Sequence, residues 1–174
     1  GNIPREPVNI AAQSLNISPK RCPMIFIDTQ SILTTKNNTA RKAAILGFRR
    51  FASRSHFLYS SSKIVDAHAL LNFLTNCNPL EPLLIFGFTS FIWDFITTSP
   101  DVLNLLSSFL DVTVLHGGGW KKLASLNISD SDFSRAAHHY FNSSRTICYY
   151  GLVEQIGSIF FQCSCTVLMI KKNF

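Results

Sequence analysis

A run of three glycines is the first segment whose residue types could carry chemistry. Residues 116–122 read HGGGWKK and follow an apolar run at 112–115 (VTVL) that is typical of a β-strand. Glycine lets a backbone adopt positive φ and approach a ligand closely, and consecutive N–H groups can then hold an anion or the face of a base. The alternative is a tight strand-to-helix turn. The oxyanion loop of an esterase would also need a G-x-S-x-G motif, which the sequence lacks.

A second candidate segment combines aromatic rings, a glycine and a carboxylate. Residues 149–158 read YYGLVEQIGS, in which Tyr149 and Tyr150 end an apolar run and Gly151 follows. A tyrosine ring can stack on a purine, and the carboxylate of Glu154 can hold Mg²⁺ near phosphates. The alternative is a strand, a turn and a helix in which Glu154 only lies near the helix start.

The elements around these segments alternate between strand and helix patterns. The apolar runs predict strands at 24–27, 57–59, 83–88, 112–115, 146–150 and 165–170. Helical spacing predicts helices at 40–51 with a break at Gly47, at 66–74 with Asp66 as N-cap, at 89–96, at 100–110, and from Ser129 or Asp130 to Tyr140. This alternation predicts an α/β fold, a largely parallel sheet with helices on both faces.

Such a sheet places its functional loops together, because ligands bind at the carboxyl ends of parallel strands. Three of the predicted strands run into informative loops, at 28–29, 116–119 and 151–155. We therefore expect all three loops at one edge of the sheet.

Composition narrows the class of protein. Hydrophobic residues make up 47% of the 174 residues and charged residues 15%, which is too apolar for a disordered chain and low in charge for a free-standing domain. The formal charge is +6, but the basic residues form only short pairs, so we expect no nucleic-acid partner. The sequence has no 18-residue apolar run and its first twenty residues lack an apolar leader segment, so we expect no membrane span and a cytoplasmic protein.

Residues 1–20 are polar, contain three prolines and read as a lead-in segment, followed by one partial domain over residues 21–174. The low charge is consistent with a piece of a larger protein, because some of the apolar surface would then be covered by other parts.

Several segments together resemble one family, the LuxE-type acyl-protein synthetases of bacterial bioluminescence, within the adenylate-forming ligases. The resemblance covers roughly residues 20–163 and rests on these stretches in family order: KRxPM with Ile27-Asp28, ARxAxILGF from Ala40, LxFGFT from Leu84 with Trp93, HGGGWKKL from His116, and YYGLVEQIGSIFFQC from Tyr149. HGGGWKK followed by YYGxVEQxGSIF is a specific combination.

The resemblance implies a ligase that activates a long-chain fatty acid with ATP as an acyl-adenylate and passes the acyl group to a protein cysteine. A partner acyl reductase would then make the aldehyde. It also implies the large N-terminal domain of an adenylate-forming ligase. By this analogy the nucleotide site comprises Gly117, Gly118, Gly119, Tyr149, Tyr150, Gly151 and Gln155, the catalytic residues are Glu154, His116 and Lys121, and Glu154 approaches Mg²⁺.

Some parts of the family pattern are not found in the sequence. The phosphate loop of the family should lie before residue 20, and the acyl-accepting cysteine and the small C-terminal domain should follow the motif cysteine Cys163. We therefore expect little or no ligase activity from the isolated chain. Two alternatives remain open: a non-catalytic remnant that binds a nucleotide or a protein, and an adenylating ligase for another carboxylic acid.

Overall fold

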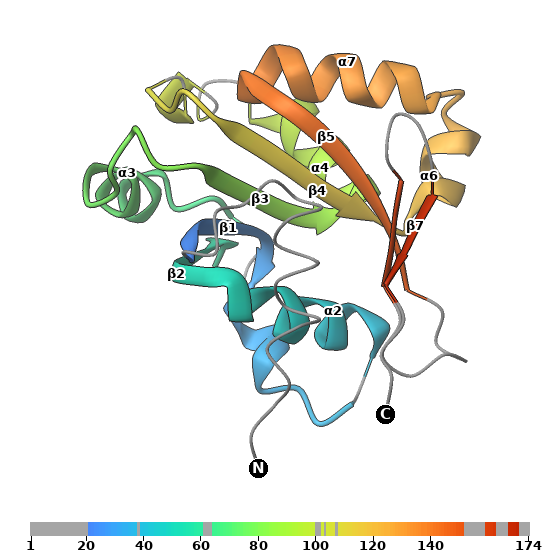
Figure 1. The fold of residues 1–174 in the computed structure, drawn as a ribbon, viewed down its shortest axis with the longest axis horizontal. Helices are drawn as coiled ribbons and strands as arrows, with labels where there is room; N and C mark the ends of the chain where they lie inside the picture. Colours follow the sequence, from blue (N-terminus) through green and yellow to red (C-terminus); the bar gives the residue numbers. More distant parts are fainter. Residues whose placement is uncertain are drawn as a thin grey trace.

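The computed structural model describes residues 21–37, 39–60, 64–99, 102, 104–106, 108–151, 159–162 and 167–170, with side chains as far as Tyr149. Seven strands form one sheet in the order β2-β1-β3-β4-β5-β6-β7. Their bounds are β1 Cys22–Thr29, β2 Ala52–Tyr59, β3 Leu83–Phe88, β4 Val112–Gly117, β5 Ser143–Gly151, β6 Ile159–Gln162 and β7 Val167–Ile170. The first five strands are all parallel, whereas β6 and β7 pair antiparallel at one end. Figure 1 shows this arrangement, and it confirms the expected α/β fold.

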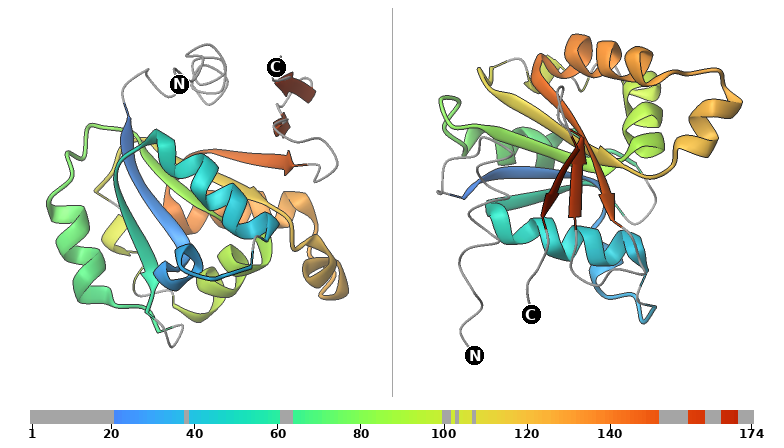
Figure 2. Two further views of the ribbon diagram at one scale, coloured as in Figure 1. Left: turned by 90° about the horizontal axis from the view of Figure 1, so that it is seen from below. Right: turned by 45° about the vertical axis from the view of Figure 1, so that its right-hand side comes forward.

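Helices cover both faces of the parallel part of the sheet. The α-helices are α2 Ala40–Phe48, α3 Ala67–Thr75, α4 Thr89–Thr98, α6 Trp120–Ser125 and α7 Asp130–Phe141, and the 3-10 helices are η1 Gln30–Leu33, η2 Arg49–Phe51 and η3 Asn104–Leu106. The two views of Figure 2 show α2 on one face, and α4 and α7 on the other.

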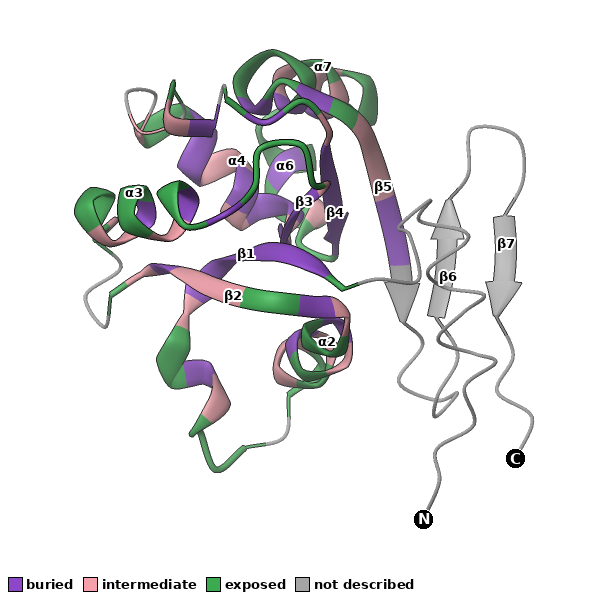
Figure 3. Ribbon diagram, turned by 60° about the vertical axis from the view of Figure 1, so that its left-hand side comes forward, coloured by how far each residue is buried: buried purple, intermediate pink, exposed green. Residues whose placement is uncertain are grey.

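Successive residues of each strand feed two separate cores, because side chains alternate between the faces of a sheet. Ile25 and Ile27 of β1 belong to the core under α3, α4 and α7. Met24 and Phe26 belong to the core under α2, which is rich in aromatic rings. Figure 3 shows that β1 and β4 are buried along most of their length, as expected for strands covered on both faces. The helices are exposed on their outer sides.

The parallel register brings the carboxyl ends of the strands to one edge. Phe88 pairs with Gly117 at the ends of β3 and β4, and His116 pairs with Cys148 in β5. The loops at Asp28 and at His116 therefore open on the same edge, as predicted. Strand β5 also ends at this edge, at Gly151, while residues 152–155 of the third loop lie outside the described residues.

The helix starts follow the predicted caps. The Asp66 carboxylate accepts the N–H of Ala69 at the start of α3, and Ser129 caps α7 in a reciprocal capping box with Asp132. The predicted break at Gly47 is wrong: α2 continues through it to Phe48. Ile45 and Phe48 are both buried in the core under α2, so tertiary packing maintains this turn of helix.

Candidate functional site

The glycine turn after β4 has a fixed conformation that the sequence explains residue by residue. Gly118 and Gly119 have φ of +68° and +78°, in the left-handed region that favours glycine. A Cβ on Gly119 would lie 2.6 Å from Ser90 Oγ, and one on Gly117 would lie 2.5 Å from the carbonyl oxygen of Tyr149. The turn is therefore wedged between the start of α4 and the end of β5. Gly118 and Gly119 are themselves exposed at the edge of the sheet.

Two hydrogen bonds attach this turn to α4. The backbone N–H of Thr89 donates to the carbonyl of Gly118 over 3.2 Å, which satisfies one of the N–H groups left open at a helix start. The Thr89 hydroxyl and His116 Nδ1 form a second hydrogen bond of 3.0 Å, buried between the strands and the helix. The turn and the first residue of α4 are thus held as one unit.

The structure places His116 beneath the turn, in the core. Its side chain is 1% exposed and its ring lies 4.4 Å from that of Phe133 and 5.9 Å from that of Trp120. Burial lowers the pKa of His116 to about 4, because the charged imidazolium would lose its hydration. The ring is therefore neutral at pH 7. Lys121, in contrast, lies exposed in the first turn of α6.

Tyr149 lies where β5 meets the glycine turn, with its ring in the core under α2. The ring stacks on Phe86 at 5.4 Å and meets Phe48 edge-on at 5.1 Å. Its hydroxyl is buried and has no hydrogen-bond partner among the described residues, and burial raises its pKa. Tyr150 and Gly151 continue β5, paired with Phe160 and Ile159 of β6. Glu154 and Gln155 lie outside the described residues.

An ion pair at the end of β1 was not among the site residues that the sequence suggested. Arg41 of α2 donates from Nε and Nη2 to the two carboxylate oxygens of Asp28, each over 2.7 Å. The Thr29 N–H donates to Asp28 Oδ1 over 2.6 Å. Asp28 is buried, with 5% exposed. The sequence signals were an acidic residue directly after a buried strand, since a buried carboxylate needs a partner, and the presence of both residues in the family-like segments.

The groups that the structure brings to this edge are therefore the glycine turn, the end of β5 and the Asp28–Arg41 pair. Within the described part of the chain, no group of three or more His, Cys, Asp or Glu side chains is arranged to hold a metal ion. Asp28 is already neutralised by Arg41. Among the described residues, no helix is long and apolar enough to cross a bilayer.

Comparison with known protein families identifies the family of this chain. The family model described as "Acyl-protein synthetase, LuxE" matches residues 9–173, nearly the whole chain. The chain belongs to the LuxE acyl-protein synthetase family. Membership supports an acyl-protein ligase function in general terms, with a carboxylate substrate and a protein that becomes acylated. Searches of curated proteins and of solved structures found no significant match.

Proposed function

We propose that this LuxE-family chain forms the adenylation part of a ligase that activates a long-chain fatty acid with ATP and passes the acyl group to a protein cysteine. The observation that carries the proposal is the junction of β4 and β5. His116 pairs with Cys148, and a Cβ on Gly117 would lie 2.5 Å from the carbonyl oxygen of Tyr149, so the HGGG turn and the end of β5 are neighbours at one edge.

In this proposal the nucleotide base lies at the exposed glycines of the turn, next to the end of β5. Gly118 and Gly119 offer backbone without side chains, and Tyr150 and Gly151 supply the adjoining surface. Gln155 follows in the same loop. Gly118 and Gly119 have positive φ and carry no side chain, so a flat ring can approach their backbone.

The chemistry needs relief of negative charge more than it needs an acid or a base. A carboxylate oxygen attacks the α-phosphorus of ATP, the bond to the bridging oxygen breaks, and pyrophosphate leaves with the electron pair. A cysteine thiolate then attacks the acyl carbon and AMP leaves. Mg²⁺ bound near the phosphates would supply electrostatic stabilisation of this charge. Glu154 is the residue of this chain that we propose for holding it, because carboxylate oxygens suit this ion.

The other two proposed catalytic residues, Lys121 and His116, differ in their exposure to solvent. Lys121 is exposed beside the turn and can approach an anionic substrate. His116 is neutral and hydrogen-bonded to Thr89, so we assign it the task of fixing the turn on α4. An acyl reductase as the partner protein, a role in bioluminescence and a cytoplasmic location remain parts of the proposal that rest on family resemblance.

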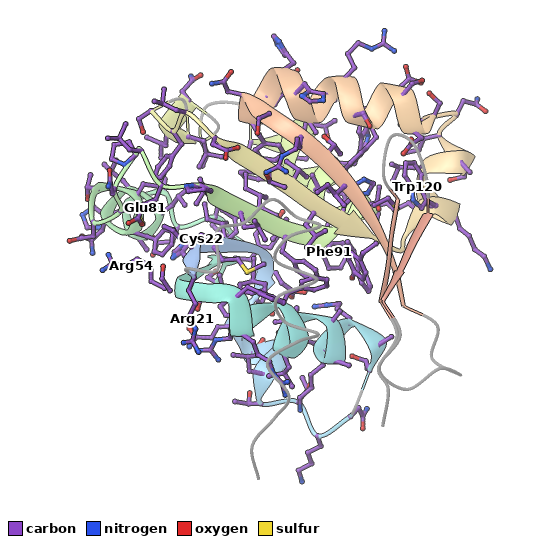
Figure 4. The ribbon with its side chains drawn as sticks, in the orientation of Figure 1. Arg21, Cys22, Arg54, Glu81, Phe91 and Trp120 are labelled. Carbon is purple, nitrogen blue, oxygen red and sulfur yellow. The ribbon has the colours of Figure 1, made fainter. Side chains whose placement is uncertain are left out.

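Isothermal titration of the chain with ATP and Mg²⁺ tests the proposal, with Glu154→Ala compared with the wild type. We expect binding by the wild type and a loss of at least tenfold in the variant, because a charge-assisted contact contributes about 1.5–3 kcal/mol. Glu81→Ala is the matched control, since Glu81 lies at the opposite edge of the sheet (Figure 4). Absence of ATP binding by the wild type would refute the proposal.

Exchange of labelled pyrophosphate into ATP separates catalysis from binding. Fatty acids of increasing chain length and aryl acids are the test substrates. Exchange that depends on a long-chain acid supports the ligase proposal. Exchange with aryl acids alone would favour a ligase for another carboxylic acid. ATP binding without exchange agrees with the little or no ligase activity expected of the isolated chain, and equally with a nucleotide-binding protein that does not catalyse adenylation.

A further inference from the structure

The Asp28–Arg41 pair lies on the same edge as the glycine turn but is not used by the proposed function. Arg41 is the second residue of α2, on one face of the sheet, and its guanidinium carbon lies 4.9 Å from the ring centroid of Phe91, in the first turn of α4 on the other face. The guanidinium therefore crosses the carboxyl edge between the two helical layers. Figure 4 shows Phe91 beside the carboxyl end of β3.

The geometry of the pair leaves part of the guanidinium available. Arg41 uses Nε and Nη2 for Asp28, whereas Nη1 has no hydrogen bond to a described residue. A guanidinium carries five N–H donors, so three of them are not used by any described residue. The side chain of Arg41 is 31% exposed, against 6% for Asp28. Asp28 and the ring of Phe91 thus fix the plane of the guanidinium. The Arg41 side chain stays partly exposed.

The local charge also favours an anion at this place. Residues 21–60 contain seven Lys and Arg and one acidic residue, Asp28. Four of the basic residues lie where β1 and β2 begin, at the opposite edge of the sheet, which leaves Lys36 and Lys42 near Arg41. Lys36 lies in the β1–α2 connection that precedes Arg41, and Lys42 follows Arg41 in the first turn of α2. A carboxylate already paired with Arg41 leaves the surrounding basic groups uncompensated, and positive potential attracts anions.

A continuous set of contacts joins Arg41 to the glycine turn. The Phe91 ring lies 6.1 Å from that of Phe88, and the Phe88 ring lies 3.6 Å from where a Cβ on Gly118 would stand. Both rings are half-buried. Strands β1 and β4 are separated only by β3, so their ends are about 10 Å apart at the usual strand spacing. A nucleotide whose base lies at the glycine turn can extend its phosphates over this distance.

Resting on the proposed function, we propose that Arg41, oriented by Asp28 and Phe91, binds the β- and γ-phosphate oxygens of ATP and the pyrophosphate that leaves. Arginine suits this task because its planar fork of N–H groups matches phosphate geometry. When the bond between the α-phosphorus and the bridging oxygen breaks, pyrophosphate takes the electron pair and the added negative charge. The fixed guanidinium stabilises that charge without having to be reoriented.

Titration of the full chain with three probes tests this assignment: ATP with Mg²⁺, inorganic pyrophosphate with Mg²⁺, and AMP. Arg41→Gln should weaken the binding of ATP and of pyrophosphate by about 10- to 100-fold, the range for a lost charge-assisted hydrogen bond. The affinity for AMP should change by less than about threefold, because AMP lacks the phosphates that Arg41 binds. Arg41→Lys keeps the charge but not the fork and should fall between the wild type and Arg41→Gln.

The control is Arg135→Gln, which removes another arginine paired with a carboxylate, on the exposed side of α7. It should leave all three affinities unchanged. If Arg41→Gln does not fold, the double variant Asp28→Asn, Arg41→Gln replaces the ion pair by two neutral amides and permits the same comparison. Circular dichroism and urea unfolding identify which variants are folded.

Each other outcome has a defined meaning. Equal weakening of ATP, pyrophosphate and AMP would show that Arg41 only supports the fold, and unchanged affinities would show that it does not contact the ligand. Weaker fatty-acid binding with unchanged pyrophosphate affinity would assign the guanidinium to the carboxylate substrate. Any of these overturns the assignment while the wild type still binds ATP. A wild type that binds no nucleotide overturns the proposed function as well.

Discussion

Acidification should destabilise this protein through one buried histidine. His116 is 1% exposed, and burial lowers its pKa from its ordinary value of 6.5 to about 4. Between these two pKa values the unfolded chain binds a proton that the folded chain does not, so the free energy of unfolding decreases as the pH is lowered. The contribution of His116 is complete above pH 6.5. It is lost as the pH falls from there to about 4.

The size of the effect follows from the shift. One pKa unit corresponds to about 1.4 kcal/mol, so the whole shift is worth about 3 kcal/mol, and most of this, about 2.5 kcal/mol, is lost by about pH 4.5. This is a large part of the free energy of unfolding of an ordinary domain, about 5–15 kcal/mol. No neighbouring charge reduces it, because burial is the one cause of the shift.

The assay is urea unfolding at pH 7.0 and 4.5, for the wild type and for His116→Asn. Asparagine does not titrate and can still reach the Thr89 hydroxyl, which bonds to His116 Nδ1. We expect the variant to be less stable than the wild type at pH 7.0. Between the two pH values, its free energy of unfolding should decrease by about 2.5 kcal/mol less than that of the wild type.

Other titrating groups remain in both proteins and cancel in this difference. Burial also lowers the pKa of His56, and hydrogen bonds from Ser129 lower that of Asp132. His139→Asn, on the exposed part of α7, is the control and should keep the wild-type difference. If His116→Asn loses as much stability on acidification as the wild type, the imidazole is hydrated and the described burial is wrong.

Three further substitutions test packing, at the glycine turn, in α2 and at the end of β5. Gly117→Ala should cost about 1–3 kcal/mol, because its Cβ would lie 2.5 Å from a backbone oxygen, whereas Gly47→Ala has nothing within 4 Å and should stabilise α2 by about 0.5–1 kcal/mol. Urea unfolding measures both, and equal effects at the two positions would contradict the described contact. Tyr149→Phe removes a buried hydroxyl without a partner among the described residues, so the melting temperature should stay unchanged or rise. A clear fall would reveal a hydrogen bond to that hydroxyl.

The strands predicted best from the sequence are those that are buried on both faces and therefore consist of a continuous run of apolar residues. The apolar runs at 83–88 and 112–115 became β3 and β4, which are covered on both faces. Strand β2 was predicted only at 57–59, because its first half includes the exposed residues Ser53 and Arg54 and lies at the edge of the sheet. Helix α6 was not predicted, since six residues are too few to show a helical period. The strand β6, Ile159–Gln162, was also not predicted.

The site was predictable in its location and less so in its contacts. Topology alone placed the loops at Asp28 and His116 on one edge, and the structure confirms it. The depth of His116 could not be read from the sequence, because it depends on Phe133, seventeen positions away in another element. Arg41 was visible only as part of a family motif. Its pairing with Asp28 depends on how α2 packs on β1, which no local pattern encodes.

The hydrogen bonds that join Thr89 to Gly118 and to His116, the residue before the glycine turn, bear on how a ligand would bind. A loop that must become ordered on binding loses conformational entropy, and this reduces affinity. Here these bonds fix the left-handed glycines against α4. A ligand that binds at the glycine turn would therefore lose little affinity to the ordering of this turn, and the shape of the turn would contribute to selectivity.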